Sequence, residues 1–329
     1  MGAAPSAAPM PAGLSHWPTI SVVMPVYNGA ETIAESIRSA LDQSVPVHEI
    51  IVVDDGSTDG TIEQVQQFGD RVRIIRQNRG GNASARNQGV EAATGEWIAV
   101  LDADDIWAAN KLERQVRLCE KADVIYSATR NFGDCSYVGD TTSIAAQCQP
   151  EDPLRALLID NYITHSSVLM RRRAALAVGN YDASLKTACD WDLWLRLADA
   201  GYRFAGVPEV LVYYRWMQGT TSRRNHGLNT RNRLRVVKRA VERSGIKRIG
   251  IHTLRLALHS VCRTSAWFAA SDQPWFALRW YLIAQVFRPT NYATWRELAA
   301  MLLRPLVDPL RGSSSASSGA SGSTGNGAP

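Results

Sequence analysis

The chain has 329 residues, and its 45% hydrophobic and 20% charged residues are ordinary for a globular protein with room for one large domain and an appendage. Its five cysteines show neither CxxC pairing nor metal-ligand spacing, which argues against a zinc site and favours a reducing cytoplasm over a disulfide framework. The net charge of +5 hides an asymmetry, because residues 1–222 hold 19 Lys and Arg against 27 Asp and Glu, whereas residues 223–329 hold 17 against 4.

Apolar strands alternate with amphipathic helices after an Ala- and Pro-rich lead-in. We expect residues 1–18 to be disordered, and they lack the features of a signal peptide. Runs of β-branched residues predict strands, and apolar positions three or four apart predict helices. In chain order the prediction is strand 19–26, helix 31–43, strand 49–53, helix 61–68, strand 72–76, helix 83–93 and strand 97–101. This alternation predicts an α/β fold with a mostly parallel sheet flanked by helices.

Polar clusters follow three of these predicted strands. They are Pro25-Val26-Tyr27-Asn28, Asp54-Asp55-Gly56-Ser57 and Asp102-Ala103-Asp104-Asp105. Ligands of such sheets bind at the carboxyl ends of the strands, so we expect the three clusters to meet in one crevice. A purely structural interpretation would have to attribute three polar strand ends to chance.

The acidic cluster is the candidate metal site. Crowded carboxylates repel one another, and a hard cation such as Mg2+ or Mn2+ makes them favourable. Asp104 could hold a metal that bridges two phosphates, and Asp102 could accept a hydrogen bond from a ribose hydroxyl. The alternative is a solvated acidic turn or a helix N-cap ahead of Trp107.

Three further side chains could complete the crevice. Tyr27 offers a ring for stacking on a base, Asp55 could accept a hydrogen bond from a base N–H, and Arg86 could bind base or phosphate. Arg86 follows the Gly-rich loop 78–82. That loop is neither GxGxxG nor a P-loop, which argues against a dinucleotide-binding fold and a Walker NTPase.

The next part of the chain predicts helix 106–122, strand 123–128, an irregular stretch to residue 150 and strand 163–170. The segment CDWDLWLRL, residues 189–197, predicts a helix with Asp190 at its start. Asp190 is either an N-cap or a general base that projects into the crevice. The polar, basic segment 215–224 is a predicted loop that either closes over a diphosphate or forms a basic surface.

The C-terminal part is helical, basic and rich in tryptophan. Residues 223–255 hold eleven Lys and Arg and one Glu, and no apolar run reaches the ~18 residues of a membrane-spanning helix. Segment 223–311 therefore either lies in a membrane interface or packs as a helical appendage on the domain or in a dimer. We expect no nucleic-acid binding. The Gly- and Ser-rich residues 312–329 are a predicted disordered tail.

The chain resembles the family 2 glycosyltransferases, inverting enzymes of the GT-A fold. The resemblance is carried, in order, by VVMPVYNGAETIAESIRSAL, IIVVDDGSTDGT, GGNASARNQGVEAATGEWIAVLDADD and CDWDLWLRL, and it covers residues 19–222. It implies a nucleotide-diphosphate sugar donor and a Mn2+ or Mg2+ cofactor. One position departs from the family pattern, because Cys189 stands where the family has Glu.

The resemblance also implies roles for individual residues. Substrate contacts would come from Pro25, Tyr27, Asp55, Arg86, Asp102 and Arg215. Asp104 would coordinate the metal with Asp102, and Asp190 would deprotonate the acceptor hydroxyl in a single displacement.

The expected function is sugar transfer to a lipid-linked or polysaccharide acceptor in cell-surface polysaccharide biosynthesis. We expect a cytoplasmic protein, peripheral at the inner face of the membrane through residues 223–311. The alternative function is a non-catalytic scaffold that binds a nucleotide sugar.

Overall fold

The computed structural model of the chain describes residues 16–134, 142–143, 150–216 and 225–312. The chain forms two compact units, residues 1–257 and 258–329. The division between the units falls after Ala257, and the boundary at residue 222 stays a prediction. Most of the predicted disordered lead-in and nearly all of the predicted tail lie outside the described residues.

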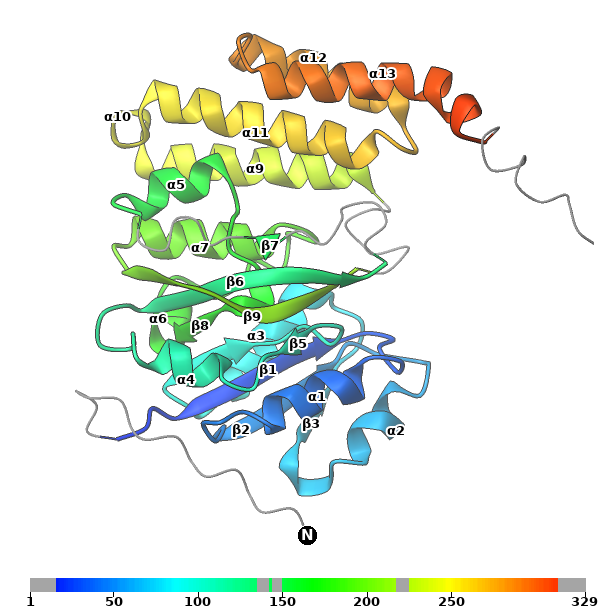
Figure 1. Cartoon of the computed structure of the whole chain (residues 1–329). Coiled ribbons are helices and arrows are strands. Elements are labelled where there is room, and N and C mark those ends of the chain that lie inside the picture. Colours follow the sequence, from blue (N-terminus) through cyan, green and yellow to red (C-terminus); the bar gives the residue numbers. More distant parts are fainter. Residues whose placement is uncertain (1–15, 135–141, 144–149, 217–224, 313–329) are drawn as a thin grey trace, which may run out of the picture. The chain divides into compact units, whose positions relative to one another are not determined.

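Within the described residues of the first unit, nine strands form one sheet with the order β3-β2-β1-β4-β8-β6-β9-β5, and β7 pairs with β6 (Figure 1). The strands are β1 (Ile20–Val26), β2 (Glu49–Asp54), β3 (Arg73–Arg76), β4 (Trp97–Val100), β5 (Ile106–Trp107), β6 (Val124–Gly133), β7 (Thr142–Ser143), β8 (Leu169–Arg171) and β9 (Phe204–Trp216). The first four strands are parallel, while β8, β5 and β7 run antiparallel to their neighbours. The predicted α/β fold is confirmed, with a sheet that is more mixed than predicted.

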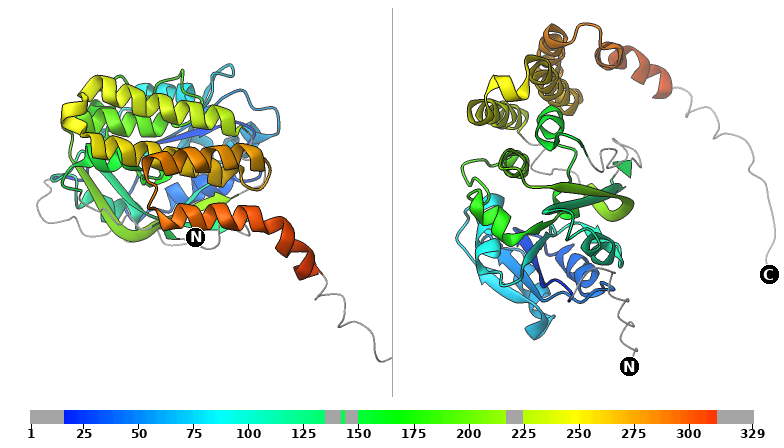
Figure 2. Two further views of the ribbon diagram at one scale, coloured as in Figure 1. Left: turned by 90° about the horizontal axis from the view of Figure 1, so that it is seen from above. Right: turned by 90° about the vertical axis from the view of Figure 1, so that its left-hand side faces the viewer.

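Helices flank this sheet. They are α1 (Ile33–Leu41), α2 (Thr61–Gln66), α3 (Asn82–Ala92), α4 (Lys111–Val116), α5 (Pro153–Ile159), α6 (Arg172–Ala177), α7 (Cys189–Asp199), α9 (His226–Ser244) and α10 (Ile246–Ile249), with 3-10 turns η1 (Gly69–Arg71) and η2 (His165–Ser167). Helix α3 lies very close to β1, because a Cβ at Gly89 would stand 2.3 Å from Val23 Cγ1. Helices α5, α7 and α9 are layered on the β6 and β9 side, and the right-hand view of Figure 2 looks nearly along them.

Four predicted elements differ from the structure. Residues 129–133 of the predicted irregular stretch continue strand β6. Residues 106–107 form a strand, because they pair with β9, and only residues 111–116 of the predicted helix 106–122 are α4. The predicted strand 163–170 is the 3-10 turn η2 followed by the short strand β8. Arg215 and Trp216 continue β9 instead of opening a loop, and the rest of that predicted loop, residues 217–224, lies outside the described residues.

The second unit is helical. Helix α11 (Ile251–Ala269) leads into it, and α12 (Pro274–Phe287) and α13 (Tyr292–Gly312) follow. Ala266, Tyr281 and Leu298 belong to its small buried core. Nε of Arg263 donates a hydrogen bond to Glu297 at 2.9 Å and so ties α11 to α13. Among the helices that the structure describes, none combines the length and the apolar character that crossing a bilayer requires.

Candidate active site

The turn after β4 carries three carboxylates with different surroundings. Asp105 is fully buried and accepts hydrogen bonds from Ser166 Oγ at 2.5 Å and from the backbone N–H of Arg215 at 2.9 Å. Burial, and then the neighbouring charges of Asp104 and Asp102, raise the pKa of Asp105 well above its ordinary value. Asp105 therefore ties the turn to η2 and β9, which leaves Asp102 and Asp104 available for a ligand.

Asp102 is paired with Arg86 of α3. Arg86 is buried, and its Nη2 donates to Asp102 Oδ1 at 2.6 Å. Burial alone would raise the pKa of Asp102, but the guanidinium charge outweighs burial and lowers it, so Asp102 is ionised. Nη1 of Arg86 lies 3.9 Å from Cys189 Sγ. The structure thus places Arg86 as the charge partner of Asp102, and direct contact of Arg86 with substrate stays a prediction.

Asp104 differs from Asp102 in its proton affinity. Burial, and then the charge of Asp102, raise the pKa of Asp104 to about 6. Two carboxylates that repel each other in this way fit a divalent cation. Within the described residues no three His, Cys, Asp or Glu side chains are grouped to hold a metal. The protein would therefore supply these two carboxylates, and substrate phosphates would supply further ligands, as is usual for Mg2+.

At the end of β2, the Asp55 carboxylate holds the Gly-rich loop. Its Oδ1 accepts hydrogen bonds from Gln77 Nε2 at 2.6 Å and from Gly80 N at 2.7 Å, and its Oδ2 accepts one from Gly81 N at 2.9 Å. Gly81 has a φ of 88°, a conformation that favours glycine, directly before α3 begins. Asp55 therefore positions the start of the helix that carries Arg86. Its contact with a base stays a prediction.

Tyr27 and Pro25 lie at the end of β1. The Arg79 guanidinium carbon stands 3.8 Å from the centre of the Tyr27 ring, and Arg79 Nη1 donates to the Tyr27 hydroxyl at 2.6 Å. Pairing of β1 with β4 ends at Val23, so Pro25, which has no N–H, costs no hydrogen bond on that side. The sequence analysis did not single out Arg79, because one arginine in a polar loop has no distinguishing pattern.

Asp190 is the second residue of α7, and it is not the N-cap. The N-cap is Ala188, at a φ of 60°, and no side chain caps this helix end. Oδ2 of Asp190 accepts a hydrogen bond from Asn161 Nδ2 at 3.0 Å. No other described side chain hydrogen-bonds to the half-buried Asp190 carboxylate, so its Oδ1 is available to a substrate hydroxyl.

His165 and Tyr181 lie between the acidic turn that carries Asp102 and the start of α7, which carries Asp190. Nε2 of His165 and the Tyr181 hydroxyl are hydrogen-bonded at 2.7 Å. Burial, and then the Arg86 charge, lower the pKa of His165 to about 4, while Asp102 and Asp190 both act in the opposite direction. The buried, neutral His165 therefore lies within electrostatic reach of both carboxylates. The sequence analysis missed it, because a lone His in an apolar segment has no motif.

Arg215 acts on the acidic turn from β9. Its Nε donates to the Asp104 carbonyl oxygen at 2.7 Å, its Nη2 pairs with Glu35 of α1, and its guanidinium lies 4.4 Å from the centre of the Phe132 ring. These contacts make Arg215 a positioning residue for the turn. A direct contact of Arg215 with substrate stays a prediction.

Arg233 of α9 also faces this region and was not predicted. Arg233 is half-buried and lies three positions after Thr230, which is buried on the inner side of α9. The adjacent Asn232 donates a hydrogen bond to Thr187 Oγ1 at 3.0 Å, which links α9 to the residues just before α7. Burial lowers its pKa, and Asp160 and Asp190 act against that shift. Arg233 makes no hydrogen bond or ion pair with any residue in the described part of the chain.

Comparison with known proteins shows which family the sequence matches. Residues 21–178 match the sequence profile described as glycosyl transferase family 2. A putative teichuronic acid biosynthesis glycosyltransferase, TuaG of Bacillus subtilis (strain 168), is 31% identical over 64% of this chain and 84% of its own length. Two uncharacterized glycosyltransferases from Rickettsia felis and Rickettsia conorii are 34% and 35% identical, but the matched parts span only 32% and 36% of their lengths.

Solved structures share the fold. The mannosyltransferase PcManGT from Pyrobaculum calidifontis, in complex with GDP-Man and Mn2+, aligns with a TM-score of 0.57 at 22% identity, over 90% of this chain and 88% of the other. TarS 1–349 of S. aureus, in complex with UDP-GlcNAc, aligns with a TM-score of 0.56 at 17% identity, over 86% and 91% of the two chains. At this identity the alignments establish a common glycosyltransferase fold.

Proposed function

We propose that this chain, which belongs to glycosyl transferase family 2, moves a sugar from a nucleotide-diphosphate sugar to a hydroxyl group of a lipid-linked or polysaccharide acceptor. The observation that carries the proposal is that Asp102 and Asp190 both act on the buried His165, while Asp104 lies beside Asp102. The names of relatives such as TuaG support a role in cell-surface polysaccharide biosynthesis.

Asp190 would be the catalytic base. Asn161 orients one carboxylate oxygen, and the other can take the proton of the acceptor hydroxyl. The acceptor oxygen then attacks the anomeric carbon as the bond to the diphosphate breaks, which inverts the configuration in a single displacement. Arg233 lies within electrostatic reach of Asp190 and would attract an anionic group on the acceptor.

The donor would be held at the strand ends. Tyr27 and the loop that Asp55 holds lie on the nucleoside side, and Asp102 and Asp104 would hold a Mn2+ or Mg2+ ion at the diphosphate. The ion would neutralise charge on the departing diphosphate. Arg86 and Arg215 keep the two carboxylates in place through the contacts described above.

A donor screen tests the proposal. Purified protein with Mn2+ or Mg2+ is titrated with UDP-, GDP- and dTDP-sugars, and binding and donor hydrolysis are both measured. We expect one donor to bind only with metal, Asp104→Ala to lose most of that affinity, and Asp190→Asn to bind normally but lose turnover. Asp192→Asn is the matched control for Asp190→Asn, because Asp192 lies on the same helix but pairs with Arg196. If no sugar nucleotide binds with either metal, the proposed function is wrong.

A further inference from the structure

Helix α12 exposes an apolar stripe. Trp275, Leu282 and Val286 are spaced seven and four residues apart, so they share one face of the helix. Trp275 is 82% exposed and Val286 is 74% exposed. Large apolar side chains that gather on one exposed face mark a surface for interaction with a partner or a membrane.

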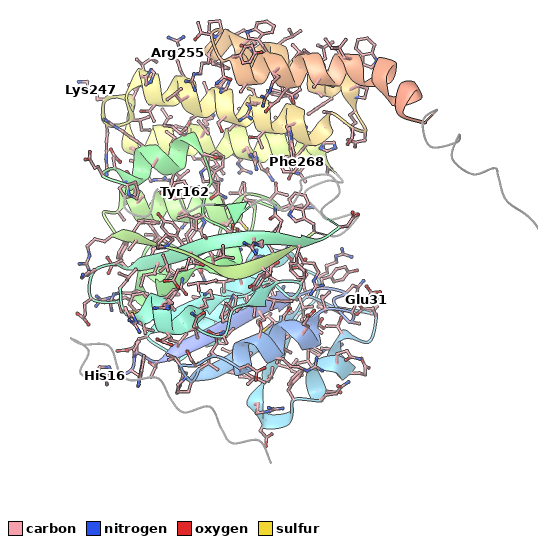
Figure 3. The ribbon with its side chains drawn as sticks, viewed as in Figure 1. His16, Glu31, Tyr162, Lys247, Arg255 and Phe268 are labelled. Atoms are coloured by element: carbon pink, nitrogen blue, oxygen red, sulfur yellow. The ribbon has the colours of Figure 1, made fainter. Side chains whose placement is uncertain are left out.

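Helix α13 carries a second stripe of the same kind. Tyr292, Trp295, Leu302 and Leu303 are all exposed, and Tyr292 is 77% exposed. Successive members of this set are three, seven and one residues apart in the sequence, which again places them on one side of a helix. Leu298 of the same helix is buried in the core of the second unit, where α12 and α13 pack together (Figure 1; side chains in Figure 3).

Three arginines lie on α12 and α13 or at the end of α12. Arg279, Arg288 and Arg296 are exposed and form no ion pair with any residue that the structure describes. No acidic residue lies on α12, and the one acidic residue of α13 up to Leu303, Glu297, pairs with Arg263.

The more basic helices of the first unit differ in this respect. Arg239 pairs with Asp182, and Arg243 and Arg248 both pair with Asp199. These three cations stabilise the first unit internally. The high positive charge of residues 223–255 is therefore a poor guide to the docking surface, and the unpaired cations beside apolar stripes in the second unit are a better one.

We propose that the exposed faces of α12 and α13 dock on an anionic lipid surface and lie in its plane. Tryptophan and tyrosine rings are favoured at the boundary between headgroups and acyl chains, and arginines beside them bind anionic headgroups. The described helices cannot span a bilayer, which agrees with in-plane docking. The docking deepens the proposed function, since a lipid-linked acceptor would be met at such a surface.

Vesicle flotation of the full chain without donor tests the proposal. We expect binding to vesicles with anionic phosphatidylglycerol, weaker binding to pure phosphatidylcholine, and partial loss at high salt. Trp275→Asp with Val286→Asp, and separately Tyr292→Asp with Leu302→Asp, should each lower the partition coefficient at least about tenfold, because losing even one large buried apolar side chain is worth about that factor. Ile246→Asp with Ile251→Asp is the matched control, because it adds the same charge at exposed apolar residues of the first unit and should leave binding unchanged.

Two results would overturn this inference. One is no flotation with anionic vesicles. The other is a stable dimer, measured by sedimentation equilibrium, that the stripe substitutions dissociate, because the stripes would then be a protein interface. Donor binding is measured separately on the same samples, so failure of lipid docking and failure of the proposed transferase function are distinguishable.

Discussion

At the scale of single residues, three neighbouring carboxylates differ because their surroundings differ. Asp105 is buried and hydrogen-bonded within the fold, Asp102 is ionised by Arg86, and Asp104 has a pKa of about 6. The sequence shows three equivalent acids after a strand. Their separate roles come from partners that are 16 to 111 positions away in the chain, Arg86, Ser166 and Arg215, and no local pattern could reveal them.

Replacing Arg86 should destabilise the protein, and metal should compensate in part. Arg86→Gln leaves Asp102 without its counter-charge beside Asp104. Breaking a buried ion pair costs roughly 3–5 kcal/mol, and we expect about 2–3 kcal/mol here because the Asp102 side chain is 25% exposed. Mn2+ should restore part of this loss, since a cation between the carboxylates replaces the missing charge. Thermal unfolding with and without Mn2+ measures both effects.

The control for this prediction is Arg203→Gln. Arg203 pairs with Asp123 through a side chain that is more than half exposed, so its loss should cost less than about 1 kcal/mol and should not respond to Mn2+. Equal metal responses in the two variants would show that the effect of Mn2+ does not come from the Asp102 and Asp104 site.

Cys189 should be chemically inert in the folded protein. It stands where the family has Glu, and burial raises the pKa of its thiol to about 11, with the nearby Arg86 charge acting against that rise. The reactive thiolate therefore becomes abundant only as the pH rises toward 11. We expect slow alkylation by iodoacetamide at pH 8 and fast alkylation after denaturation, as located by mass spectrometry. Rapid labelling of Cys189 in the native protein at pH 8 would contradict this environment.

At the scale of secondary-structure elements, the strand ends were predictable and the contacts between elements were not. The strands β1, β2 and β4 and the helices α1 and α7 follow from apolar runs and helical spacing, which are local properties of the sequence. The prediction of a helix directly after Asp105 was wrong, because Ile106 and Trp107 form a strand through pairing with β9, more than 100 positions away in the chain. Arg233 lay outside the region of resemblance, so neither a motif nor spacing pointed to it.

Arg215 should act through the acidic turn. Arg215→Gln removes the hydrogen bond from Nε to the Asp104 carbonyl and the pair with Glu35 of α1. We expect weaker metal-dependent donor binding, because the turn that carries Asp104 loses its link to α1. Glu35→Gln removes only the ion pair and should weaken binding less, by up to about fivefold, because the Glu35 side chain is 54% exposed and its pair with Arg215 is partly screened by solvent. Isothermal titration with the donor found in the screen measures both variants.

The comparison of the two variants separates positioning from contact. If Arg215 touches the diphosphate, Arg215→Gln should lower affinity for the sugar nucleotide far more than affinity for the metal alone, and Glu35→Gln should have no effect. If both variants lose affinity for the metal and for the sugar nucleotide to a similar extent, Arg215 acts by positioning the turn.

At the scale of the whole molecule, the two compact units should carry separable properties. All candidate site residues lie in the first unit, whereas the exposed apolar stripes lie in the second. A chain ending at Asp272 keeps α11 complete and removes α12 and α13. We expect it to bind donor with unchanged affinity and to lose flotation with anionic vesicles, because the removed helices supply the apolar stripes.

Circular dichroism provides the control for this truncation, since the shorter chain must keep a cooperative unfolding transition before its binding is compared. Removing α12 uncovers Ala266 and Ala269 of the small core, whose little apolar area limits the expected loss of stability. Loss of donor binding by a chain that is still folded would show that α12 or α13 supports the candidate active site. Retained vesicle binding would instead assign lipid contact to the basic helices of the first unit, as the charge count of the sequence suggested.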